Sequence, residues 1–248
     1  MTKIIVDIWR TSLHREEIGF KKTEEYRAKS RKFTADMDLF GKVKIDKKDY
    51  GYIGYRKKLW ETDKLENKIL DVRLFDDTMN WLGTIEENLL KSVLLTIVNE
   101  ETSLSFAVTL RDTRIMFPIE SVRARFLSGN LFSFPYISDK GEIQGLILKS
   151  KKISIGGDWE IIDALTNKKI AKVDGKVLDI GGRWEIDANK IKDENLRKIL
   201  ILFAATLRFY DDLKERTEKL VEKVKKEKKW FKLNKTMMSL FYNPKVRR

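Results

Sequence analysis

Short runs in which hydrophobic and polar residues alternate occupy most of the chain between residues 38 and 187. Alternation with a period of two predicts half-buried strands, because successive side chains of a strand point to opposite faces. Turn signals such as Asp139-Lys140-Gly141 separate the runs. The predicted strands are 3–9, 40–45, 50–55, 68–75, 81–85, 91–98, 103–110, 114–118, 131–137, 142–149, 152–155, 159–163, 169–173, 177–180 and 183–187. Many short strands at close spacing indicate a sandwich or a barrel.

Two segments have a helical pattern instead. Residues 11–33 carry many i,i+4 charge pairs. In the second segment, Asp193 is a candidate N-cap for a helix over 193–216. Between residues 199 and 207 this helix is apolar on every side. A helix without a polar face must be enclosed on all faces, and a closed sheet wrapped around it would do this.

A short motif occurs twice. Gly156-Gly157-Asp158-Trp159-Glu160-Ile161 is echoed by Gly181-Gly182-Arg183-Trp184-Glu185-Ile186, 25 residues later. One interpretation is a repeated hairpin of a single sheet. The other is a backbone nest in which paired glycines hold an anion.

The end of the strand region resembles the tubby C-terminal-like superfamily, which includes tubby proteins, phospholipid scramblases and LURP-one-related proteins. The resemblance covers residues 143–216. It rests on the strand pair at 159–173, which begins Trp159-Glu160-Ile161-Ile162, on Arg183-Trp184-Glu185-Ile186-Asp187, and on the apolar helix 196–210. It implies a closed antiparallel barrel around a central hydrophobic helix, and members that bind lipids or other partners. It implies no active site, and it identifies no lipid-binding residue in this chain.

Together these patterns predict a mainly β protein: a closed antiparallel β-barrel of about a dozen strands around a central hydrophobic α-helix. We expect three parts. Residues 1–35 form a basic, helical N-terminal arm. Residues 36–216 form the tubby-like barrel, with its central helix at 193–216. Residues 217–248 form a basic, aromatic C-terminal tail.

Composition narrows the chemistry. The 248 residues include no cysteine and one histidine, His14, which excludes disulfides, thiolate nucleophiles and multi-histidine metal sites. Walker, Rossmann and nucleophile-elbow motifs are absent from the sequence. We therefore expect no enzyme, no cofactor and no metal. The charged fraction of 36% is typical of a thermophile. The N-terminus does not have the pattern of a signal peptide, and we expect a cytoplasmic protein.

Charge is concentrated at the two ends of the chain. The net charge is +13, of which residues 1–35 contribute +4 and residues 217–248 contribute +8. A nearly neutral body with basic ends favours binding to a polyanion, either nucleic acid or an anionic membrane. The candidate nucleic-acid or anion-binding residues are Lys225, Lys226, Lys228, Lys229, Trp230, Phe231, Lys232, Lys235, Arg123, Arg125, Lys29, Arg31 and Lys32.

Apolar residues among the tail lysines suggest a further use. If the helix from residue 193 continues, Leu220, Val224, Phe231, Met238 and Tyr242 share one stripe. The stripe would lie on a membrane, dock on a partner or on a second copy of the chain, or pack on its own barrel. The candidate docking residues are Phe231, Met238, Phe241 and Tyr242.

Three functional hypotheses follow. The first is a non-enzymatic binding protein that docks on structured RNA or on a ribosome or other ribonucleoprotein surface through its basic ends. The second, from the resemblance, is a protein that binds anionic lipid at a membrane surface. The third is an enzyme with a carboxylate site in the barrel mouth.

Overall fold

The structure is a computed structural model, and it describes residues 2–8, 38–123, 129–138, 140–151, 157–176 and 182–233. The predicted helix at 11–33 and the predicted strands at 152–155 and 177–180 lie outside these residues.

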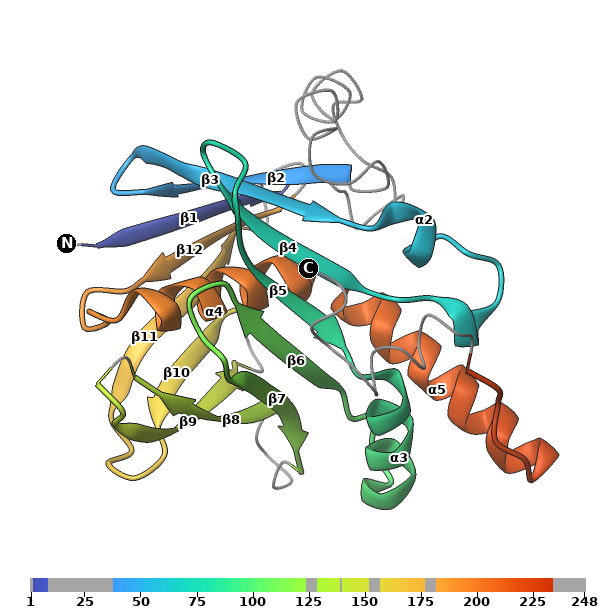
Figure 1. Ribbon diagram of the computed structural model, residues 1–248. Coiled ribbons are helices and arrows are strands. Elements are labelled where there is room, and N and C mark those ends of the chain that lie inside the picture. The colour runs from blue at the N-terminus through green and yellow to red at the C-terminus, as the bar shows by residue number, and fades with distance from the viewer. Residues whose placement is uncertain are drawn as a thin grey trace.

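Twelve strands, all paired antiparallel, form one closed barrel in which each strand neighbours the next in sequence (Figure 1). The predicted barrel of about a dozen strands is therefore confirmed. The strands are β1 (Lys3–Ile8), β2 (Asp38–Ile45), β3 (Lys48–Tyr55), β4 (Asp71–Asp76), β5 (Trp81–Glu87), β6 (Ser105–Leu110), β7 (Met116–Val122), β8 (Leu131–Ile137), β9 (Ile143–Ser150), β10 (Trp159–Asp163), β11 (Lys169–Lys176) and β12 (Arg183–Asp187).

The first strand closes the barrel. Val6 of β1 lies opposite Trp184 of β12 on one side and opposite Val43 of β2 on the other. Ile4, Val6 and Ile8 are fully buried, as the period-two pattern predicts. Residues 3–8 thus belong to the barrel, although they fall within the range 1–35 that the charge pattern assigns to the arm.

Helical segments occur between and after the strands: α2 (Lys57–Trp60), η1 (Leu65–Asn67), α3 (Leu89–Asn99), α4 (Glu194–Thr206), η2 (Leu207–Phe209) and α5 (Tyr210–Glu227). The strand predicted at 91–98 is wrong, because these residues form α3. The side chain of Asn88 caps α3 by accepting a hydrogen bond from the Lys91 N–H at 3.2 Å. Leu89, Val93 and Thr96 are buried at helical spacing.

Helix α4 begins where the N-cap predicts. The Asp193 carboxylate accepts hydrogen bonds from the backbone N–H groups of Asn195 and Leu196, at 2.9 and 3.2 Å. All residues of α4 except Glu194 and Arg197 are buried. The helix contacts β1, β4, β5, β6 and β12, and Figure 1 shows it among these strands.

The predicted helix over 193–216 is divided in the structure. The 3-10 turn η2 separates α4 from α5, and α5 continues beyond residue 216 to Glu227 and extends away from the barrel (Figure 1). The expected boundary between barrel and tail at 216/217 therefore falls inside a helix. Lys228, with φ +51°, ends α5 in the left-handed conformation, and the residues after it leave the helix.

The two copies of the repeated motif become strands β10 and β12, which lie on either side of β11. β10 and β12 pair with opposite edges of β11, with Trp159 opposite Val173 and Trp184 opposite Gly175. Both tryptophans are buried.

Candidate functional site

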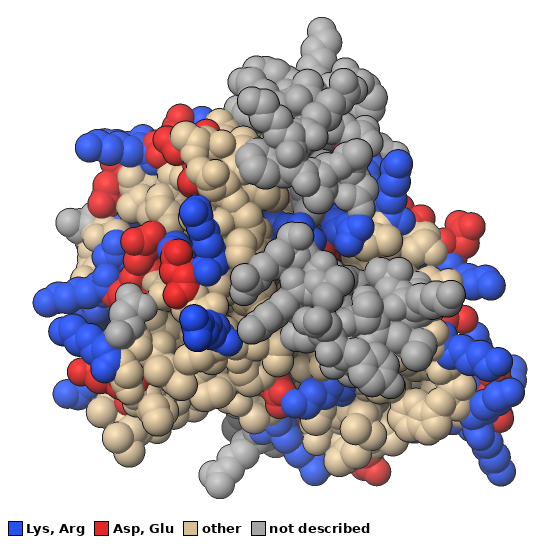
Figure 2. Space-filling view, in the orientation of Figure 1, with Lys and Arg blue, Asp and Glu red and all other residues tan. Residues whose placement is uncertain are grey.

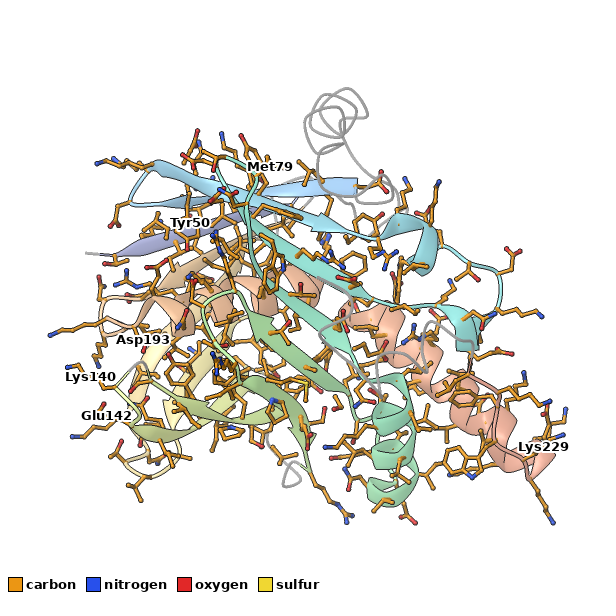
Figure 3. The ribbon with its side chains drawn as sticks, in the orientation of Figure 1. Tyr50, Met79, Lys140, Glu142, Asp193 and Lys229 are labelled. Atoms are coloured by element: carbon orange, nitrogen blue, oxygen red, sulfur yellow. The ribbon has the colours of Figure 1, made fainter. Side chains whose placement is uncertain are left out.

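Lysine side chains gather where α5 ends. We call residues 225–232 the basic tip; they include five lysines and one acidic residue, Glu227. All five lysines (Lys225, Lys226, Lys228, Lys229 and Lys232) are exposed. Figure 2 shows Lys and Arg predominating at this end of the molecule, and Figure 3 places Lys229 at the far end of α5.

Several lysines of the barrel are held in ion pairs. Lys42 contacts Asp49 at 2.8 Å, and Lys151 and Lys169 share Glu160 at 3.3 and 3.2 Å. Within the described part of the chain, none of the five lysines of the basic tip makes an ion pair. Their charge is therefore available to an external anion.

Ion pairs shift the pKa values of charged residues in the barrel. Burial alone would raise the pKa of the Glu160 carboxyl, but hydrogen bonds and charge from Lys169 and Lys151 outweigh it and lower the pKa. Burial would lower the pKa of Lys172, yet Asp158 and Asp174 raise it. These barrel charges are compensated locally.

The two aromatic residues of the basic tip lie in different environments. Trp230 is 49% exposed. Phe231 is half-buried against the cluster of Ile69, Leu89, Val93, Leu220 and Val221, which α3, α5 and the segment before β4 contribute. Trp230 is therefore available for stacking on a ligand, whereas Phe231 mainly packs on its own protein.

The apolar stripe of α5 also packs inward. Leu220 and Val224 are buried, and α5 contacts α3. Because α5 ends at Glu227, the stripe does not continue as one helix through Phe231. Docking on a partner and contact with a membrane both need an exposed stripe. Leu220 and Val224 are buried in this structure and are not available for either use.

The remaining predicted residues are mostly outside the described residues. Arg123 is exposed, directly after β7. The others are Lys29, Arg31, Lys32, Arg125, Lys235, Met238, Phe241 and Tyr242.

A buried ion pair ties α5 to the barrel, and sequence reasoning missed it. Arg216 of α5 donates to the Glu87 carboxylate at the end of β5, and both residues are only 3% exposed. Arg216 Nη1 also donates to the Lys68 carbonyl at 2.9 Å, and its guanidinium lies 5.3 Å from the Trp60 ring centroid. The available signal was the helical spacing of Arg216 with Leu213 and Leu220, which places it on the buried face.

The described residues contain no cluster of three or more His, Cys, Asp or Glu side chains that would hold a metal ion. None of the helices in these ranges is long and apolar enough to cross a membrane.

Comparison of the chain with protein-family models, curated proteins and solved structures finds no match. The resemblance to the tubby-like superfamily therefore stays a hypothesis, which rests on the sequence pattern at 143–216.

Proposed function

We propose that the protein is a non-enzymatic binding protein that docks on structured RNA, such as a ribonucleoprotein surface, through the basic tip. The observation that carries the proposal is the cluster of five exposed lysines around the half-exposed Trp230, which make no ion pair within the described part of the chain. Ammonium groups bind phosphates, and an exposed indole stacks on an unpaired base.

The packing of α5 favours RNA over a membrane. A helix that lies on a membrane buries its apolar face among the lipids. The apolar face of α5 is already buried against its own protein at Leu213, Leu220, Val221 and Val224. The basic tip therefore offers charge and one indole, which suit a polyanion with accessible bases better than an acyl layer.

The barrel would serve as a rigid support. In this proposal α4 is the central helix of the tubby-like arrangement and fills the barrel, and the Glu87–Arg216 pair fixes the direction of α5. A rigid body that presents one charged protrusion loses little conformational entropy when it binds.

The test compares two charge variants of the full chain. The first carries Lys225→Ala, Lys226→Ala, Lys228→Ala and Lys229→Ala in the basic tip. The matched control carries Lys48→Ala, Lys140→Ala, Lys168→Ala and Lys192→Ala, which remove four exposed lysines that lie outside the basic tip and make no ion pair with a described residue. Lys140 lies on the other side of the molecule from Lys229 (Figure 3). Both variants lose the same charge.

Binding is measured with purified ribosomal RNA over a series of salt concentrations. We expect the tip variant to bind at least ~30-fold more weakly at ~0.1 M salt, with a slope of log K against log [salt] about 3 to 4 units shallower. The control should change far less. Equal losses of RNA affinity in both variants would show that binding depends on net charge and not on the position of the lysines. Tight, lysine-dependent binding to vesicles containing phosphatidylserine, with no RNA binding, would replace the proposal with the lipid hypothesis.

A further inference from the structure

A polar cavity of about 440 Å³ lies at the end of the barrel from which α5 leaves. The ends of β7 and β9, the start of β8 and the first turn of α5 surround it. This volume is typical of a site for a small molecule and too small for a folded nucleic acid. The lining residues are Glu101, Thr102, Ser121, Val122, Gly129, Asn130, Leu131, Ser150, Lys151, Tyr210 and Lys214.

Four of the lining side chains have unused hydrogen-bonding capacity. Among the described residues, the Tyr210 hydroxyl, the Lys214 ammonium, the Asn130 amide and the Ser150 hydroxyl make no hydrogen bond or ion pair. Asn130 is exposed and the other three residues are half-buried, so a ligand that enters the cavity can reach all four groups. They come from three separate segments, which only the fold brings together.

Ring packing and backbone contacts hold these groups in place. The Tyr210 ring packs on Phe132 and Trp159, with centroid distances of 6.2 and 6.0 Å. Lys214 Nζ lies 5.7 Å from the Tyr210 centroid. Close packing holds the opposite wall, because a Cβ at Gly129 would lie 2.5 Å from the Ser150 carbonyl and hydroxyl oxygens. The Ser150 N–H donates to the Asn130 carbonyl at 2.9 Å.

The lining residues carry two ammonium groups, Lys151 and Lys214, and one carboxylate, Glu101. Lys214 can only donate, and the Tyr210, Ser150 and Asn130 side chains each offer a donor hydrogen. Burial, together with the nearby Asp211 carboxylate, raises the pKa of Tyr210, so its hydroxyl keeps its proton at neutral pH. Lys151 adds a second ammonium, already paired with Glu160 at 3.3 Å, and Glu101 is the one acidic residue of the lining.

We propose that this cavity binds a small oxyanion ligand, a molecule with a phosphate or carboxylate group, which Lys214 and Tyr210 contact. The ligand would accept hydrogen bonds from donors that have no partner among the described residues. The site is separate from the basic tip, so it stands or falls independently of RNA docking.

Isothermal titration calorimetry of the full chain tests the site with inorganic phosphate, glycerol 3-phosphate and succinate. These probes distinguish a phosphate from a carboxylate ligand. We expect saturable binding of at least one probe. Lys214→Ala should weaken it by about 10-fold or more, and Tyr210→Phe, which keeps the ring packing, by about 5-fold. Lys223→Ala, on the same helix but outside both the cavity and the basic tip, should change binding less than about 2-fold.

Two results would overturn the proposal: no saturable heat with any of the three probes, or equal affinity in wild type, Lys214→Ala and Tyr210→Phe. Thermal unfolding of each variant shows that it is folded before titration. Should Lys214→Ala fail to fold, Tyr210→Phe alone decides the outcome, since it removes one oxygen and leaves the aromatic contacts.

Discussion

Helices α4 and α5 follow one another in the chain, separated only by η2, yet their surroundings are opposite. Nearly every residue of α4 is buried. This includes Lys198, whose ammonium group forms ion pairs with the Asp112 and Glu194 carboxylates. α5 buries a single face, and its last turn and the residues after it expose lysines. The contrast separates a buried region, which stabilises the fold, from an exposed and basic one.

Lysine occurs in different environments in the two helices. Lys198 of α4 is 4% exposed and ion-paired, so it is part of the folded structure. Lys225 of α5 is exposed and unpaired within the described residues. Substitutions in α4 should therefore cost stability, and substitutions in the basic tip should cost binding.

Phe203→Ala in α4 has the largest expected effect. The Phe203 ring is 1% exposed and packs on Phe132 and Trp159, at centroid distances of 5.6 and 5.4 Å. Its removal leaves a cavity and should lower the free energy of unfolding by about 3–5 kcal/mol, as measured by chemical denaturation. Trp230→Ala in the basic tip is the control, with an expected change under about 0.5 kcal/mol. Equal losses of stability in the two variants would contradict the distinction between α4 and the basic tip.

Glu87→Gln tests the attachment of α5 and should cost about 2–3 kcal/mol in the same assay, because it leaves the buried Arg216 guanidinium without a counter-charge. The double variant Glu87→Met with Arg216→Met removes both charges and should recover most of the loss. A double variant as unstable as Glu87→Gln would show that the charges themselves are needed.

Lys228→Gly sharpens the distinction at the end of α5. Lys228 has φ +51°, which glycine adopts without steric cost, so the substitution should raise the free energy of unfolding by about 0.5–1 kcal/mol. RNA affinity should fall slightly in the same protein, since one phosphate contact is lost. Lys226→Gly, inside the helix, should instead destabilise.

The smallest expected effect is confined to acid. Burial alone would raise the pKa of Asp76, but hydrogen bonds from Asn80 and Thr78 outweigh it and lower the pKa. A depressed carboxyl pKa gives stability that is present above the unfolded value of about 3.9 and is lost as pH falls through the folded value. Asp76→Asn should therefore reduce the drop in stability between about pH 5 and pH 2. The drop is measured by thermal unfolding of both proteins over this pH range. An unchanged pH profile would contradict this role.

Much of the barrel was predictable because strands and caps are local features. The predicted strands at 131–137, 159–163 and 183–187 have the bounds of β8, β10 and β12. The Asp193 cap was predictable because a carboxylate at the N-cap reaches N–H groups two and three residues ahead. Residues 91–98 were assigned wrongly because a short apolar run fits a buried strand as well as a helix.

The chain alone thus decided the strand pattern, the start of α4 and the concentration of charge at its ends, all of which depend on neighbours within a few residues. Tertiary structure decided the inward packing of Phe231, the Glu87–Arg216 pair and the cavity at Tyr210 and Lys214. Glu87 and Arg216 are 129 positions apart. Contacts at that separation depend on how the barrel closes, which no local pattern of hydrophobic and polar residues records.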